Sequence, residues 1–150
     1  MKPNSVAVVG AAETTRLGVI PDMSVIQLHA DAALNVIADA GIRMKDIDGI
    51  ATAGESPTSL AHYLGITPTW VDGSSVGGCS FMLHVRHAAA AINAGLCSTV
   101  LITHGESGRS RVGAGGRFGV VAMQACPDSS KRHMVLSDRR RCLRCQCCVT

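Results

Sequence analysis

The feature that most constrains the fold is a regular alternation of short apolar runs with longer amphipathic segments. The apolar runs are rich in β-branched residues and are typical of strands, and the segments between them have helical periodicity. The expected strands are residues 5–10, 48–53, 69–72 and 98–103. Because helices separate successive strands, right-handed crossovers would place the strands in one mostly parallel sheet. The chain is therefore predicted to be an α/β protein with the element order βαβαβαβ.

The expected helices carry recognisable end signals. Ser24 and Gln27 have the spacing of a capping box, and Gly41 is a natural stop for the helix that follows them. A serine–proline pair at residues 56–57 opens a second helix, and an alanine-rich third helix runs to about residue 94. Since aromatic residues make up 3% of the chain, the core must be built mainly from Ala, Val, Ile and Leu.

Composition changes abruptly about three quarters of the way along the chain. Residues 1–116 carry seven Lys/Arg and nine Asp/Glu, a net charge of −2, whereas residues 117–150 carry seven Lys/Arg and two Asp, a net charge of +5. All sixteen glycines lie at or before Gly119, and five of the seven cysteines lie in the last 25 residues. We predict a first domain over residues 1–113. Residues 114–150 are predicted to be an unrelated Cys/Arg-rich tail that is disordered or results from a change of reading frame.

Residues 71–85 contain the side chains best placed for chemistry. Cys79 lies at the first turn of the third helix, where unpaired amide N–H groups and the helix dipole favour the nucleophilic thiolate. The helix-start amides of Gly77, Gly78 and Ser80 form a candidate substrate-binding cradle for an oxyanion or a phosphate. Cys79 is therefore a candidate nucleophile for acyl transfer. The alternative is that Cys79 is a small, half-buried helix-start residue without a chemical role.

Four stretches in this order resemble the first part of a thiolase of the sterol-carrier-protein type, often described as acetyl-CoA acetyltransferase-like: residues 6–14, 40–51, 77–80 and 94–107. The resemblance implies a five-layer fold of two similar halves, of which this chain would be an N-terminal fragment. It further implies acyltransferase activity on coenzyme A thioesters in lipid metabolism, without a bound cofactor. The expected working unit is a homodimer or a thiolase-type hetero-complex.

The candidate site departs from the family's pattern, in which the nucleophile stands in Cys-x-Ser/Thr-Gly and opens the helix. Here Met82 stands where that pattern has glycine, and the family's spacing counted back from Gly95 and Glu106 reaches Gly78. Two interpretations stay open: a one-residue shift makes Cys79 the nucleophile, or the nucleophile is lost. The family's general-base histidine and second cysteine come from its C-terminal half, which the resemblance does not reach. This chain alone is therefore expected to be inactive.

Two groups of side chains, a histidine pair and a cysteine cluster, have spacings that are also found in metal sites. His84 and His87 lie one turn apart on the third helix, and the cysteines of residues 142–148 follow a C-x-x-C-x-C-C pattern. We predict no metal site, because the histidines suit a partly exposed helix face and the cysteines lack a second, separated ligand pair. A small zinc- or nucleic-acid-binding protein centred on the tail is a further alternative, although we predict no nucleic-acid partner.

The leading interpretation is a thiolase-like acyltransferase whose activity belongs to an intact parent protein. The alternative is a non-catalytic thiolase-like subunit that binds acyl-CoA or lipid. No apolar stretch approaches the roughly 20 residues of a membrane span, and no signal-peptide pattern precedes the first strand. We therefore expect a cytoplasmic protein without a membrane span.

Overall fold

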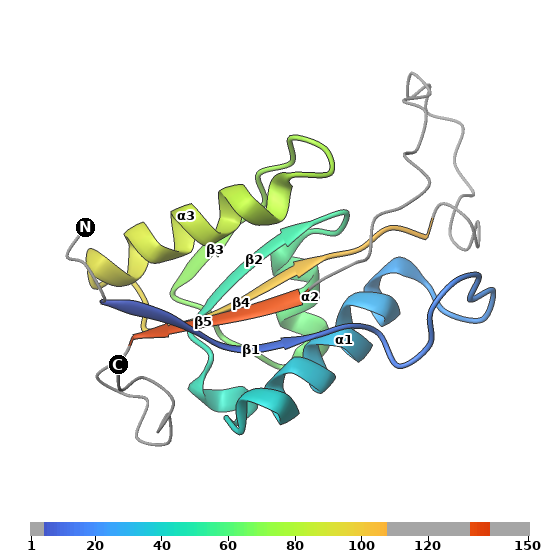
Figure 1. The fold of residues 1–150 in the computed structure, drawn as a ribbon, viewed down its shortest axis with the longest axis horizontal. Helices are drawn as coiled ribbons and strands as arrows, with labels where there is room; N and C mark the ends of the chain where they lie inside the picture. The colour runs from blue at the N-terminus through green and yellow to red at the C-terminus, as the bar shows by residue number, and fades with distance from the viewer. Residues whose placement is uncertain (1–4, 108–132, 139–150) are drawn as a thin grey trace, which may run out of the picture.

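The computed structural model describes residues 5–107 and 133–138, and this part of the chain forms one mixed sheet with helices on both faces (Figure 1). Its strands are β1 (Val6–Ala12), β2 (Gly49–Ala53), β3 (Trp70–Asp72), β4 (Thr99–His104) and β5 (His133–Asp138). They lie side by side in the order β1-β5-β4-β2-β3. β2 pairs in parallel with β3 and β4, whereas β5 is antiparallel to both β1 and β4. The four strands expected from the sequence therefore all point the same way, which confirms the predicted α/β class and mostly parallel sheet.

The helices begin and end close to the predicted positions. They are α1 (Val25–Ala40), the short 3-10 helix η1 (Met44–Asp46), α2 (Pro57–Leu64) and α3 (Ser80–Asn93). The side chain of Gln27 accepts a 2.8 Å hydrogen bond from the Ser24 backbone N–H, which is one half of the expected capping box. Glycine follows α1 and α2 as the capping residue. None of the helices in the described residues is long and apolar enough to cross a membrane.

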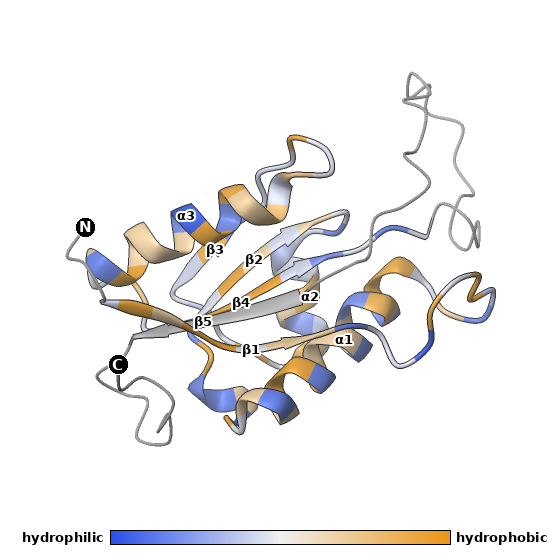
Figure 2. Ribbon diagram, in the orientation of Figure 1, coloured by the Kyte–Doolittle hydropathy of each residue, from blue (hydrophilic) through white to orange (hydrophobic). Residues whose placement is uncertain are grey.

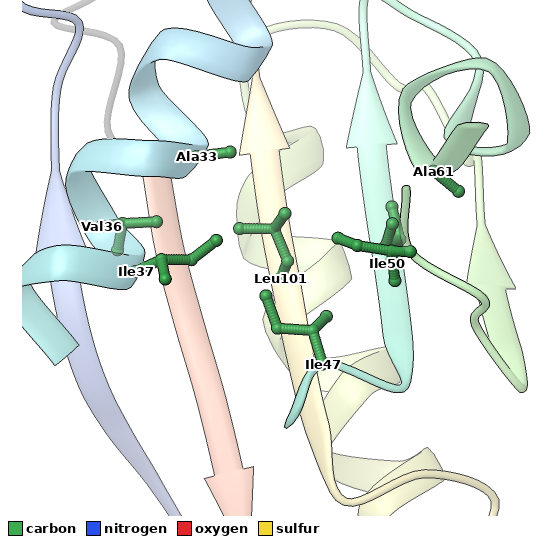
Figure 3. Packing of buried hydrophobic residues seen from close by; sticks show 8 residues of the cluster. Ala33, Val36, Ile37, Ile47, Ile50, Ala61 and Leu101 are labelled. Carbon is green, nitrogen blue, oxygen red and sulfur yellow. The ribbon is translucent and has the colours of Figure 1, made fainter. Parts of the chain in front are cut away.

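The core has two layers because side chains alternate across the central strands. Leu101 of β4 packs with α1 and α2 on one face, whereas its neighbours Val100 and Ile102 pack with α3 on the other. Figure 3 shows this first layer, with Leu101 beside Ile37 of α1 and Ile50 on the side of Ala61 of α2. Figure 2 shows apolar residues along β2 and β4 and mixed polarity along α1 and α3, as expected for helices that each cover one face. The described residues thus form an α/β/α sandwich.

β5 lies within residues 114–150, which were expected to be an unrelated Cys/Arg-rich tail, either disordered or the result of a change of reading frame. In the structure the backbone of His133–Asp138 pairs with β1 on one side and β4 on the other, so these residues form a strand of the sheet. A strand between β1 and β4 satisfies backbone N–H and C=O groups that would otherwise form two open sheet edges. The other residues of the 114–150 segment lie outside the described residues, so the domain boundary near residue 113 stays a prediction.

Candidate functional site

The candidate site lies at the carboxyl ends of the parallel strands. β3 ends at Asp72, and residues 73–79 lead from it to α3. The first turn of α3 lies beside the end of β4, since the ring centroids of Phe81 and His104 are 6.2 Å apart. In open α/β sheets this edge is where ligands usually bind. The loop of residues 73–79 therefore lies where a ligand-binding site is expected.

Cys79 directly precedes α3 and is exposed to solvent together with Gly77 and Gly78. Gly77 has a φ of 88°, which favours glycine, and a Cβ added at either glycine would meet open space. The Cys79 thiol donates to the carbonyl oxygen of Val76, with an S···O distance of 3.8 Å. Within the described residues, no hydrogen-bond acceptor lies at the amide N–H groups of Gly78 and Cys79. The structure thus brings the predicted nucleophile and two of the predicted binding residues together at an open surface, while their roles stay predictions.

Ser80, the third predicted binding residue, is fully buried. Its hydroxyl donates to the Gly77 carbonyl at 2.6 Å and accepts from the Val76 N–H at 3.0 Å. Its own N–H donates to the Gly77 carbonyl at 3.0 Å. The hydrogen-bonding groups of Ser80 are therefore used to hold the loop, and the sequence pattern did not reveal this role.

His84 and His87 bind the loop that precedes their own helix. Nε2 of His84 donates to the carbonyl of Ser74 at 2.8 Å, and Nδ1 of His87 lies 2.6 Å from the Asp72 carboxylate. His84 is fully buried, in contrast to the partly exposed face expected for it, and its Nδ1 has no hydrogen-bond partner in the described part of the chain. Residues 5–107 and 133–138 contain no cluster of three metal-ligating side chains, and the cysteines of residues 142–148 lie outside these ranges.

The Asp72 carboxylate is held in its charged form. Burial raises its pKa, but hydrogen bonds from Ser74 and from His87 outweigh that effect, so the pKa lies below its ordinary value. The Ser74 N–H donates to Asp72 at 2.8 Å. Asp72 therefore anchors the loop through its hydrogen bonds with Ser74 and His87.

His29 is a buried histidine at the same edge of the sheet whose role was not expected from the sequence. Its Nε2 lies 3.1 Å from the Gly105 carbonyl, and its Nδ1 lies 2.7 Å from the Thr103 hydroxyl. A carbonyl can accept but not donate, so in the neutral ring Nε2 carries the proton and the Thr103 hydroxyl donates to Nδ1. The signal in the sequence is positional, because residue 29 continues the apolar row of α1 that includes Ala33 and Val36. His29 ties α1 to the end of β4.

Cys97 offers a comparison for Cys79 because it is a buried thiol, 7% exposed. Burial, and secondarily the negative charge of Asp48, raises the pKa of Cys97 to about 11. The Cys97 thiol therefore stays protonated well above neutral pH.

Replacing Cys97 by alanine is expected to change how the free energy of unfolding depends on pH. In the unfolded chain the thiol ionises near its ordinary pKa of roughly 8.5, so above that pH the unfolded state holds fewer protons than the folded state. Its contribution to stability is fully present below that pH and is lost as the pH rises toward about 11. Near pH 11 the free energy of unfolding of the unsubstituted protein should have fallen by about 2 to 3 kcal/mol more than that of Cys97→Ala. Urea unfolding of both proteins from neutral pH upward measures the difference, and parallel curves would contradict the burial of this thiol.

No family model and no curated protein matches the sequence. Solved structures do match. The Ltp2-ChsH2(DUF35) aldolase superposes with a TM-score of 0.61 and 25% identity over 83% of this chain and 31% of its own. A monomeric SCP2-thiolase-like protein type 1 from Mycobacterium smegmatis has a TM-score of 0.59 and 27% identity over 79% of this chain and 27% of its own. This chain thus spans less than a third of the length of these two proteins.

A more distant match extends over more of the chain. OleA from Xanthomonas campestris, solved with bound lauric acid and lauroyl-CoA, has a TM-score of 0.67 and 12% identity. The match covers 91% of this chain and 57% of that protein. At this identity the likeness is one of fold.

Proposed function

We propose that this chain, which has a thiolase-like fold, carries the nucleophile-bearing part of an acyltransferase that acts on acyl-CoA thioesters. The observation that carries the proposal is Cys79, which stands directly before α3 at an open surface and beside two amides that lack acceptors among the described residues. OleA, which shares this fold, was solved with lauroyl-CoA bound. Together these features favour thioester chemistry at the start of α3.

The proposed step is transfer of an acyl group to Cys79. The sulfur of Cys79 bonds to the thioester carbonyl carbon and forms a tetrahedral oxyanion; its collapse breaks the bond to the coenzyme A sulfur, and the proton released by Cys79 ends on the leaving thiolate. The amides of Gly78 and Cys79 can stabilise the oxyanion that forms in between. In this proposal the general base and the other catalytic groups come from residues outside 5–107 and 133–138. The proposal includes an acetyl-CoA acetyltransferase-like activity in lipid metabolism, in the cytoplasm, within a homodimer or hetero-complex.

A non-catalytic, acyl-CoA-binding subunit is the second candidate. It is favoured by Met82, which stands where the family's nucleophile pattern has glycine, and by the contact of the Cys79 thiol with a backbone carbonyl in place of a base. The aldolase that matches this chain is named after two components, Ltp2 and ChsH2. Both candidates share the loop before α3 as the binding surface, and they differ in whether Cys79 becomes acylated.

Alkylation of the two described thiols tests the proposal. At pH 8 iodoacetamide should modify Cys79 at least about 100-fold faster than Cys97, because only about one Cys97 in a thousand is then a thiolate. Since exposure alone favours Cys79, the decisive result is protection: lauroyl-CoA should slow alkylation of Cys79 saturably. Mass spectrometry should also find a slow, single acylation of Cys79, because an ionised thiol needs no general base for this first step even though this chain alone completes no catalytic cycle.

The matched controls are Cys97→Ala, which should behave like the parent protein, and Cys79→Ala, which should take up no acyl group. Protection of Cys79 without acylation would favour the non-catalytic subunit. If lauroyl-CoA neither protects nor acylates Cys79, neither candidate function holds.

A further inference from the structure

α3 presents one polar side chain per turn to the loop that leads into it. We call Ser80, His84 and His87 the polar row. They follow one another at intervals of four and three residues, so they share one face of the helix. Each of them bonds a different residue at the end of β3 or in the loop that follows it: His87 bonds Asp72 at 2.6 Å, His84 bonds Ser74 at 2.8 Å and Ser80 bonds Val76 at 3.0 Å. The polar row therefore binds every second residue of the segment that leads into α3, from Asp72 to Val76.

The spacing of these bonds has a simple geometric basis. Two residues of nearly extended chain advance about 6.6 Å, and three or four residues of helix advance about 4.5 or 6 Å. Alternate residues of the chain from Asp72 to Val76 can therefore meet successive turns of α3. Because the partners on α3 run in the reverse order, from His87 to Ser80, the chain returns along the helix in the opposite direction.

The inner side of the loop is closed to water at Ser80 and His84 and half-open at His87, whose side chain is 41% exposed, whereas its outer side is open. Ser80 and His84 have no exposed surface, and the Asp72 side chain is 11% exposed. Hydrogen bonds screened from water hold their partners more firmly than exposed ones. Gly77 and Cys79, by contrast, are exposed. The loop is thus anchored from behind while its front can receive a ligand.

A direct chain of contacts links the polar row to the thiol. The Ser80 hydroxyl accepts from the Val76 N–H and donates to the Gly77 carbonyl. The carbonyl of the same Val76 accepts from the Cys79 thiol. Any change in the position of Val76 therefore changes the surroundings of the Cys79 sulfur and of the amides next to it.

We infer that Ser80, His84 and His87 are positioning residues, which hold the chain from Asp72 to Gly78 against α3 and so fix the geometry of Cys79. The effect on acyl-CoA rests on the proposed function, whereas the effect on the order of the loop does not. His84→Leu fills the space of the ring without its hydrogen bond, and His87→Ala alters a half-exposed site that tolerates truncation. The conservative variants are His84→Gln, which can still donate to Ser74, and Asp72→Asn. In Asp72→Asn the carbonyl oxygen of the introduced side chain can accept from the Ser74 N–H while its amide donates to Nδ1 of the His87 tautomer that is protonated at Nε2.

The test uses two measurements on the full chain. Hydrogen exchange of the Val76 amide should become at least tenfold faster in His84→Leu and His87→Ala, while the amides in the middle of α1 are unchanged. The lauroyl-CoA concentration that halves the rate of Cys79 alkylation should rise at least tenfold in both variants. His84→Gln and Asp72→Asn should keep both values within about threefold of the parent protein, and the exposed neighbour variant Arg86→Ala should match it.

The outcomes separate the two proposals. If exchange at Val76 is unchanged in both variants, the polar row does not hold the loop and the inference is wrong. If exchange accelerates but the half-protecting concentration does not move, the row does not position Cys79 and the inference is equally wrong. If the parent protein shows no protection while exchange accelerates as expected, the proposed function fails and the holding of the loop stands. If His84→Leu does not fold, the comparison of His87→Ala with Asp72→Asn tests the inference, because both variants alter the same hydrogen bond.

Discussion

Replacing Gly54 by alanine is expected to lower the free energy of unfolding by at least ~3 kcal/mol. Gly54 follows β2 with a φ of 98°, a conformation that costs an L-residue roughly 1 to 2 kcal/mol. The added Cβ would also fall on the carbonyl oxygen of Gly105, which is backbone and cannot rotate away. The ends of β2 and β4 would have to separate, and the bond from the Gly105 N–H to the Ala53 carbonyl would be lost. Urea unfolding followed by circular dichroism measures the change.

Gly18→Ala is the matched control for this prediction. Gly18 has a similar φ of 92°, but a Cβ there would meet nothing within 4 Å. Its substitution should cost roughly 1 to 2 kcal/mol, the part due to conformation alone. Equal losses in the two variants would mean that the ends of β2 and β4 do not approach each other this closely. Because the site lies at this edge of the sheet, Gly54→Ala should also abolish protection of Cys79 by lauroyl-CoA.

Truncation of Leu101 to alanine is the second change with a large expected effect. Leu101 has no exposed surface and lies at the centre of the layer between the sheet and α1, as Figure 3 shows. Removing three buried carbon atoms loses their transfer free energy and leaves a cavity, which together should cost about 3 kcal/mol. The urea midpoint should fall without a change in the slope of the transition.

Leu34→Ala is the control, because Leu34 lies on α1 but is 53% exposed. Its truncation should change the free energy of unfolding by less than about 0.5 kcal/mol. A similarly small effect for Leu101→Ala would contradict a well-packed layer between α1 and the sheet.

The elements that the sequence predicts well are those specified by neighbours in the chain. The strands over 48–53 and 98–103 and the three helices follow from periodicity and from caps, which act within a few residues. β5 could not be found in this way, because His133–Asp138 contains only a short apolar run and lies in a segment of different composition. Its place between β1 and β4 depends on pairing with strands far away in the chain, which no local pattern encodes.

The candidate site can be predicted only in part. The helix start with Cys79, Gly77 and Gly78 can be located, since small residues before an alanine-rich helix are a local signal. Ser80 and His84 are of residue types that suggest a surface or ligand-binding role, because such residues are more often exposed. Their burial depends on the loop that folds back over α3, and partners up to ten residues away in the chain are visible only in three dimensions.

The position of β5 also determines the order in which this fold can assemble. β1 precedes every other strand of the sheet in the chain, yet its residue 6 pairs with residue 138. During translation β2, β3 and β4 can associate as soon as they emerge, whereas β1 must wait for a partner made more than a hundred residues later. Until then β1 and β4 each present an unpaired edge to other chains. The insertion of β5 is thus the late, non-local event on which completion of the sheet depends.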